Sequence, residues 1–80
     1  VHVLIIPKIT DLESARDINP AEHAILLGEL YDAANKIAKQ LGVFESGFRL
    51  VLNSGVDSGQ DVPHLHIHLL GGRKMNWPPG

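Results

Sequence analysis

The 80-residue chain has no cysteine, few aromatic residues and no long hydrophobic run. The lack of cysteine excludes disulfides and agrees with a reducing compartment, so we expect a cytoplasmic protein. The longest apolar run, Val3 to Ile6, is far shorter than the ~20 residues that span a membrane. Seven Lys and Arg residues against nine Asp and Glu residues leave no basic stripe for phosphates. We therefore expect neither a membrane nor a nucleic-acid partner.

The composition is that of a folded domain, with 44% hydrophobic and 20% charged residues. Residues 1–80 are enough for a single domain. A domain this small buries only about 60% of the surface that its unfolded chain exposes. We therefore expect additional support from a partner subunit, a ligand or further sequence, particularly because the chain opens directly on apolar residues.

Hydrophobic periodicity predicts the order strand, helix, strand, strand. The first strand covers Val1–Ile6 and stops at Pro7, which cannot donate to a sheet. The second covers Phe48–Asn53, and the third covers His64–Leu70 before two glycines. The Gly-rich segment Ser54–Gln60 would join the last two strands as a hairpin loop. This order predicts an α+β fold, an antiparallel β-sheet with one main helix packed on it.

The helix has clear end signals. Asn19 is a favourable N-cap, Pro20 suits the first helical position, and Glu22 follows the cap by three residues. Apolar residues then recur at helical spacing as far as Leu41, and Gly42 suits the position after the helix. The sequence therefore predicts a helix that starts at Pro20 and ends at Leu41.

Two smaller signals concern turns and packing. Thr10 and Glu13 have the spacing of a capping box, which predicts a short helical turn that ends before Asn19. Gly28 lies inside the predicted main helix, where glycine destabilises by about 1 kcal/mol relative to alanine. Either Gly28 is exposed and without consequence, or another backbone, such as that of a second subunit, approaches it closely.

Three histidines alternate with apolar residues in the third predicted strand. Successive side chains of a strand point to opposite faces, so His64, His66 and His68 share one face. The other face carries Leu65, Ile67 and Leu69 and is expected in the core. Structural histidines would explain one such residue, but three in strict alternation favour a functional site.

Such a row allows two chemistries. Zinc requires several nitrogens about 2.0–2.1 Å from one ion, whereas residues two apart in a strand are separated by ~6.6–6.8 Å. His2 on another strand could add a ligand, so a zinc hydrolase remains an alternative. Without metal, a neutral imidazole is a nucleophile at pH 7, and a neighbouring imidazole can protonate the leaving group. The preceding glycine loop favours this second chemistry, because its backbone N–H groups can form a nest for an anion such as phosphate.

The segment from Gly59 to Arg73 resembles the signature of the histidine triad superfamily, and the ending Trp77–Gly80 resembles its Hint branch. Residues Val1–Lys8 resemble the family's third strand. The resemblance implies a hydrolase that cleaves purine nucleoside phosphoramidates, or related nucleotides, at the α-phosphorus. It implies a covalent nucleotidyl-histidine intermediate and no metal or other cofactor.

The resemblance also assigns roles. His66 would be the nucleophile, His68 would contact the phosphate and help protonate the departing amine, and His64 would orient His66. Substrate contacts would come from Asn53, Gly59, Gln60, Asp61, His2 and Trp77. Asp61 departs from the family, which often has a hydroxyl residue there, and its carboxylate would repel a phosphate. Trp77 is equally well explained as a packing anchor.

Family members hold the purine and ribose mainly by residues upstream of the third strand. We therefore expect a domain that lacks the family's N-terminal part. The family also forms homodimers that join their sheets and bring the C-terminal tail to the neighbour's site. An alternative is a nucleotide-binding or scaffold protein whose chemistry is vestigial.

Overall fold

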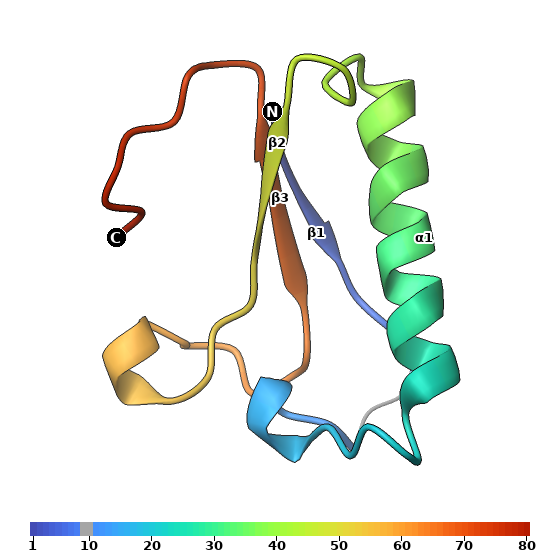
Figure 1. The fold of residues 1–80 in the computed structure, drawn as a ribbon. Helices are drawn as coiled ribbons and strands as arrows, with labels where there is room; N and C mark the ends of the chain where they lie inside the picture. Colours follow the sequence, from blue (N-terminus) through green and yellow to red (C-terminus); the bar gives the residue numbers. More distant parts are fainter. Residues whose placement is uncertain (9–10) are drawn as a thin grey trace.

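The computed structural model describes residues 1–8 and 11–80. Three strands are present, β1 (His2–Ile5), β2 (Phe48–Val51) and β3 (Ile67–Gly71). One long helix, α1 (Ala24–Gln40), follows β1, and two short 3₁₀ turns, η1 (Ala15–Asp17) and η2 (Val56–Ser58), lie in the connections. The expected α+β architecture is confirmed: the strands form one antiparallel sheet and α1 covers one of its faces (Figure 1).

The histidine-bearing strand β3 is central, because the strand order is β1-β3-β2 and both pairings are antiparallel. Cross-strand partners lie on the same face of a sheet. His68 pairs with Leu4 of β1 and with Val51 of β2, while Leu70 pairs with His2 and with Arg49. All six residues therefore belong to the sheet face opposite the helix.

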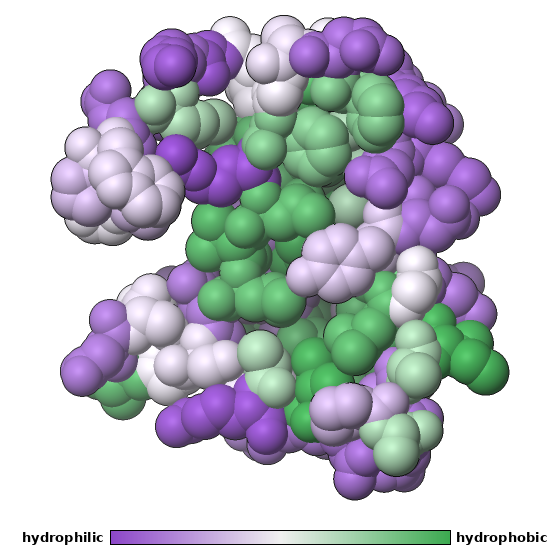
Figure 2. Space-filling model, in the orientation of Figure 1, coloured by the Kyte–Doolittle hydropathy of each residue, from purple (hydrophilic) through white to green (hydrophobic). Residues whose placement is uncertain are grey.

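The core lies between the other sheet face and α1. Leu65, Ile67 and Leu69 are each at most 1% exposed, as the alternation predicts. The helix contributes a stripe of buried residues at helical spacing, namely Leu30, Ala34 and Ala38. The small side chains of the two alanines let the helix lie close to the sheet. Apolar surface also remains exposed over the strands and the adjoining edge of α1 (Figure 2).

The helix starts later than the sequence predicts. Asn19 does accept hydrogen bonds from the backbone N–H groups of Ala21 and Glu22, at 3.0 and 3.3 Å, but residues 20–22 form a turn. The α-helix begins at Ala24, with His23 as its N-cap residue. The ring Nδ1 of His23 accepts the N–H of Asn19 at 2.9 Å, so the two side chains stabilise this turn ahead of the helix.

The helix end agrees with the sequence. Gly42 has φ +74° and follows the last helical turn, as its position predicts. Its N–H bonds the carbonyl of Lys39 at 3.2 Å, and the N–H of Val43 bonds the carbonyl of Ala38 at 3.0 Å. These two bonds form a Schellman motif, which satisfies carbonyls that the helix itself leaves unpaired.

The bounds of all three strands also differ from the predictions. β1 and β2 end at Ile5 and Val51, one and two residues earlier than expected. β3 begins only at Ile67, so His64 and His66 precede the strand although their side chains keep the alternation. Thr10 lies outside the described residues, and the short turn begins at Ala15, where the carboxylate of Asp17 accepts the N–H of Ser14 at 3.0 Å.

None of the described helices has the length and apolarity needed to cross a membrane.

Candidate active site

The ring of His66 is held by the backbone two residues before it. Its Nδ1 lies 2.6 Å from the carbonyl oxygen of His64. A carbonyl oxygen only accepts hydrogen bonds, so Nδ1 carries the proton and donates. The neutral ring then has its lone pair on Nε2, which is the form that a nucleophilic imidazole requires.

His64 positions His66 through its carbonyl, whereas its own ring bonds elsewhere. The Nε2 of His64 donates to the carbonyl of Pro7 at 3.1 Å, which ties the segment before β3 to the end of β1. The orienting role that the resemblance assigned to His64 stays a prediction, which its carbonyl oxygen could perform through this contact. The carbonyl of Pro7 is a partner that the sequence did not indicate.

His68 and His2 form a second pair on the same face. The Nε2 of His2 lies 2.8 Å from the Nδ1 of His68, so one of these nitrogens donates to the other. The ring of His68 also packs edge-on against that of His66, with 4.9 Å between centroids and 67° between planes. Desolvation by burial, followed by the positive charges that His66 and His2 would carry, lowers the pKa of His68; the carboxylate of Asp61 opposes this.

A lowered pKa keeps His68 neutral at pH 7. When His2 donates in the pair, the remaining proton of His68 is on Nε2. That N–H faces away from His2 and can donate a hydrogen bond to a substrate atom. Two neutral imidazoles with complementary roles, one with a free lone pair and one with a free N–H, thus lie side by side.

The glycine-rich loop is built on two residues with positive φ, Gly55 at +84° and Gly59 at +81°. Such values are unfavourable for residues with a Cβ, which favours glycine at both positions. Between them, η2 turns the chain, and the hydroxyl of Ser58 donates to the carbonyl of Gly55 at 2.6 Å. The guanidinium of Arg16 lies against Gly55, 3.2–3.3 Å from where a Cβ would be.

The side chain of Gln60 fastens this loop to its surroundings. Its Oε1 accepts the N–H of Gly55 at 2.9 Å, and its Nε2 donates to the carbonyl of Glu13 at 2.7 Å and to that of Val62 at 3.2 Å. All three bonds are to backbone atoms. The amide of Gln60 thus supports the loop, and its expected contact with substrate stays a prediction.

The remaining expected substrate residues are distributed unevenly. Asn53 is half-buried just after β2, and Asp61 is exposed in the loop close enough to His68 for its charge to act there. Trp77 is 82% exposed on the C-terminal tail, which leaves the sheet after β3 (Figure 1). The tail is fixed by Arg49, whose Nη2 donates to the carbonyl of Asn76 at 3.3 Å.

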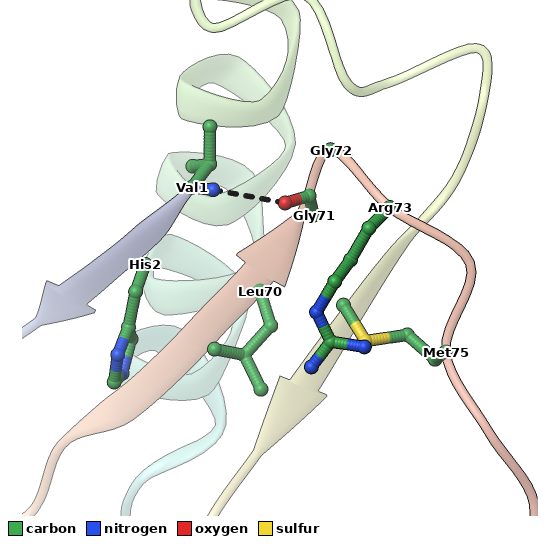
Figure 3. A pocket seen from close by; sticks show the side chains of 7 residues that line it. All are labelled: Val1, His2, Leu70, Gly71, Gly72, Arg73 and Met75. Atoms are coloured by element: carbon green, nitrogen blue, oxygen red, sulfur yellow. Dashed lines mark hydrogen bonds between the residues drawn. The ribbon is translucent and has the colours of Figure 1, made fainter.

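Two hollows lie beside the histidine row. One, of about 250 Å³, adjoins His64 and His66 and is otherwise apolar, lined by Leu4, Ile6 and Val62. The other, of about 380 Å³, adjoins His2 and contains Arg73 (Figure 3). Sequence reasoning missed Arg73 as a candidate, since a cation after a Gly-Gly pair has no distinctive pattern of its own.

Comparisons with known proteins agree with this geometry. Residues 1–75 match the HIT domain family. The chain is 48% identical to Adenylylsulfatase HINT1 of Arabidopsis thaliana over 80 residues, which is 100% of this chain and 54% of that protein. It is also 48% identical to the 14 kDa zinc-binding protein of Brassica juncea over 80 residues, 100% of this chain and 70% of that one.

A solved structure, that of a HIT family hydrolase from Legionella pneumophila, superposes with a TM-score of 0.93 at 46% sequence identity. The match covers 99% of this chain and 69% of that one. The chain thus spans about half of the Arabidopsis relative and about two thirds of the other two proteins. Its fold, its histidine row and its sequence matches together show that the chain belongs to the HIT domain family.

Proposed function

We propose that this domain is the catalytic part of a hydrolase that cleaves purine nucleoside phosphoramidates, or related nucleotides, at the α-phosphorus. The carrying observation is the 2.6 Å contact between the Nδ1 of His66 and the carbonyl of His64. It fixes the tautomer that leaves Nε2 of His66 free to attack. The relatives named as a HIT family hydrolase and as an adenylylsulfatase support hydrolysis at a nucleotide.

The reaction proceeds in two displacements. The lone pair on Nε2 of His66 attacks phosphorus and forms an N–P bond, while the P–N bond to the leaving amine breaks. That electron pair stays on the amine nitrogen, which takes the Nε2 proton of a His68 ring that has first bound a proton from solvent, so that His68 returns to its neutral form. Water then attacks the phosphorus of the nucleotidyl-histidine, gives a proton back to the site, and releases the nucleotide and free His66.

The surroundings suit these steps. The N–H groups of Gly59 and Gln60 bond carbonyls of the loop at 3.0 and 3.4 Å and so shape it. The donor for the phosphate oxygens, on which charge builds up in the transition state, would be the backbone N–H of Asp61, for which no bond is found within the described residues. The apolar hollow beside His64 and His66 offers a place for a flat, weakly polar group such as a purine. Asn53, half-buried just after β2, would be a further donor to the phosphate.

The experiment is rapid quenching of the protein with an adenosine phosphoramidate, followed by mass spectrometry of the histidine peptides. We expect an added nucleotide on His66 and loss of both adduct and turnover in His66→Ala. His23→Gln is the matched control, because it removes an imidazole outside the row. Full turnover by His66→Ala would refute the proposal. Tight nucleotide binding with no adduct would favour the alternative of a nucleotide-binding or scaffold protein.

A zinc-dependent mechanism has less support from the geometry than the metal-free mechanism. The Brassica juncea relative is named a zinc-binding protein, but the described part of this chain contains no group of three or more His, Cys, Asp or Glu side chains able to hold a metal. The two facing nitrogens of His2 and His68 are hydrogen-bonded to each other at 2.8 Å, so neither is free for an ion. Stoichiometric metal together with activity that chelators abolish would reverse this conclusion.

We also infer that the protein is a cytoplasmic homodimer. The apolar surface over the strands and the small size of the domain support association (Figure 2). Trp77 is exposed on the tail, which supports a contact with a neighbouring subunit. Light scattering on the complete protein at micromolar concentration would give twice the chain mass if this is correct, and the chain mass if it is wrong.

A further inference from the structure

The two hollows beside the histidine row differ in chemistry and lie toward opposite ends of it. The apolar hollow adjoins His64 and His66 at one end. The hollow of about 380 Å³ adjoins His2 at the other end, and His2 in turn contacts His68. A substrate stretched along the row would therefore meet an apolar environment on one side and a polar one on the other.

The hollow at the His2 end is cationic. Figure 3 shows His2 and Arg73 on either side of Leu70, with the guanidinium of Arg73 beside Met75. A neighbouring hollow of about 270 Å³ shares Arg73 and Met75 and adds Arg49 and Lys74. Within the part of the chain that the structure describes, neither lining contains an acidic residue.

Arg73 has donors to spare for a ligand. Its Nη1 donates to the carbonyl of Lys74 at 3.2 Å, and this is the one hydrogen bond of its side chain found within the described residues. A guanidinium has five N–H donors in a planar fork that matches a carboxylate or a similar oxyanion. The single bond orients the group and leaves the other donors available.

The geometry of the reaction decides which part of a substrate reaches this hollow. In phosphoryl and nucleotidyl transfer the attacking and leaving atoms are roughly in line through phosphorus. With His66 attacking from its end of the row, the leaving group extends toward His68 and His2. We propose that the hollow at His2 receives the leaving group and that Arg73 makes the site selective for leaving groups that carry a negative charge. This inference rests on the proposed function and adds the class of leaving group to it.

The test compares two adenosine phosphoramidates that differ only in charge, one made with β-alanine and one with β-alaninamide. We expect wild-type protein to have the higher kcat/KM for the carboxylate. We expect Arg73→Gln to lower the carboxylate-to-amide ratio about fivefold to tenfold, the effect of one close charge pair near water. Arg73→Lys, which keeps the charge but not the fork, should give an intermediate ratio.

Lys74→Gln is the matched control, because Lys74 is the next cation in the chain and does not line the hollow at His2. We expect it to leave the ratio unchanged. An unchanged ratio in Arg73→Gln, or an equal change in Lys74→Gln, would overturn the proposal. If Arg73→Gln does not fold, the wild-type ratio at rising salt serves instead, since screening should reduce it.

Failure of this inference can be told apart from failure of the proposed function. If both compounds are cleaved and the carboxylate-to-amide ratio of kcat/KM does not depend on Arg73, the proposed hydrolase activity stands and the proposed leaving-group subsite is wrong. If neither compound is cleaved, the hydrolase proposal fails. The subsite is then tested by calorimetry, as the ratio of the affinities of the carboxylate and the amide for wild type and for Arg73→Gln. A carboxylate preference that depends on Arg73 then supports the subsite, and its absence overturns it.

Discussion

The carbonyl oxygen of His64 lies 2.6 Å from Nδ1 of His66 and so determines which nitrogen of that ring is free. The contact is between residues two apart in the chain, just before β3 begins. It depends on the backbone of position 64 rather than on its side chain. Substitution of the His64 ring would therefore act on His66 only indirectly, through the loss of the bond to Pro7.

The titration of His68 is the first prediction. Burial, with the nearby rings of His66 and His2, lowers its pKa, so its midpoint in an NMR titration should fall below the ordinary 6.5. His2→Phe removes one of the two opposing charges and should move the midpoint back toward 6.5. A midpoint at or above 6.5 in the wild-type protein would contradict the described arrangement.

The same lowered pKa has a consequence for stability. Below pH 6.5 the unfolded chain binds a proton at His68 more readily than the folded chain does, so the free energy of unfolding decreases as pH falls from 6.5 through the lower folded-state pKa. Above 6.5 this contribution no longer changes with pH. Urea denaturation of wild type and His68→Gln between pH 7.5 and 5 would measure it, and we expect the variant to lose less stability on acidification.

Gly55 and Gly59 allow the loop to be tested. Both have positive φ, but ψ is 178° at Gly55 and 17° at Gly59, and a Cβ on Gly55 would also meet Arg16. Only Gly59 has the left-handed conformation that other residues adopt at moderate cost, so we expect Gly59→Ala to destabilise by about 1 kcal/mol and Gly55→Ala by more. Adding Arg16→Ala to Gly55→Ala should recover the part that comes from the contact with Arg16. Equal costs in the two single variants would contradict this expectation.

Gln60→Ala should loosen the loop, because it removes three hydrogen bonds to backbone atoms of Gly55, Glu13 and Val62. Loss of such bonds typically destabilises by about 1–3 kcal/mol. If the loop holds the phosphate, KM should rise more than kcat falls, since the histidine row does not depend on this amide. Thermal melting and steady-state kinetics would measure the two effects. A variant with wild-type KM would show that the loop does not need Gln60.

Gly28→Ala should stabilise the protein. Gly28 is exposed on α1, and a Cβ there would meet nothing within 4 Å in the described structure. Alanine is favoured over glycine in a helix by about 1 kcal/mol, so thermal melting should show an increase of that size. If a second subunit approached this backbone closely, the substitution would instead weaken self-association, which light scattering would detect.

Much of the fold could be predicted from local patterns. The alternation of His64 to Leu69 indicated both the core face and the histidine face, because side-chain direction in extended chain follows from spacing alone. Gly42 was recognised because few other residues adopt a positive φ at a helix end. The predicted start of α1 was wrong, because Asn19 caps a turn in the same way that it would cap a helix. Only the contact with His23 distinguishes the turn from a helix start.

The site was less predictable wherever it depends on contacts between distant segments. The pairing of His2 with His68 requires the register of β1 on β3, which no local pattern specifies. The bonds of Gln60 to Glu13, and of the His64 ring to Pro7, likewise join residues 47 and 57 positions apart. Arg73 was missed because its relevance follows from the hollow that it lines.

The central position of β3 has a consequence for amide hydrogen exchange. Residues 68–70 are paired on both sides, by β1 and by β2, so their amides should be among the slowest to exchange in the molecule. His64, His66 and the glycine loop precede this protected segment and should exchange faster. Deuterium uptake should therefore be slow in β3 and faster in the segment before it. Nucleotide binding should slow exchange only in that preceding segment.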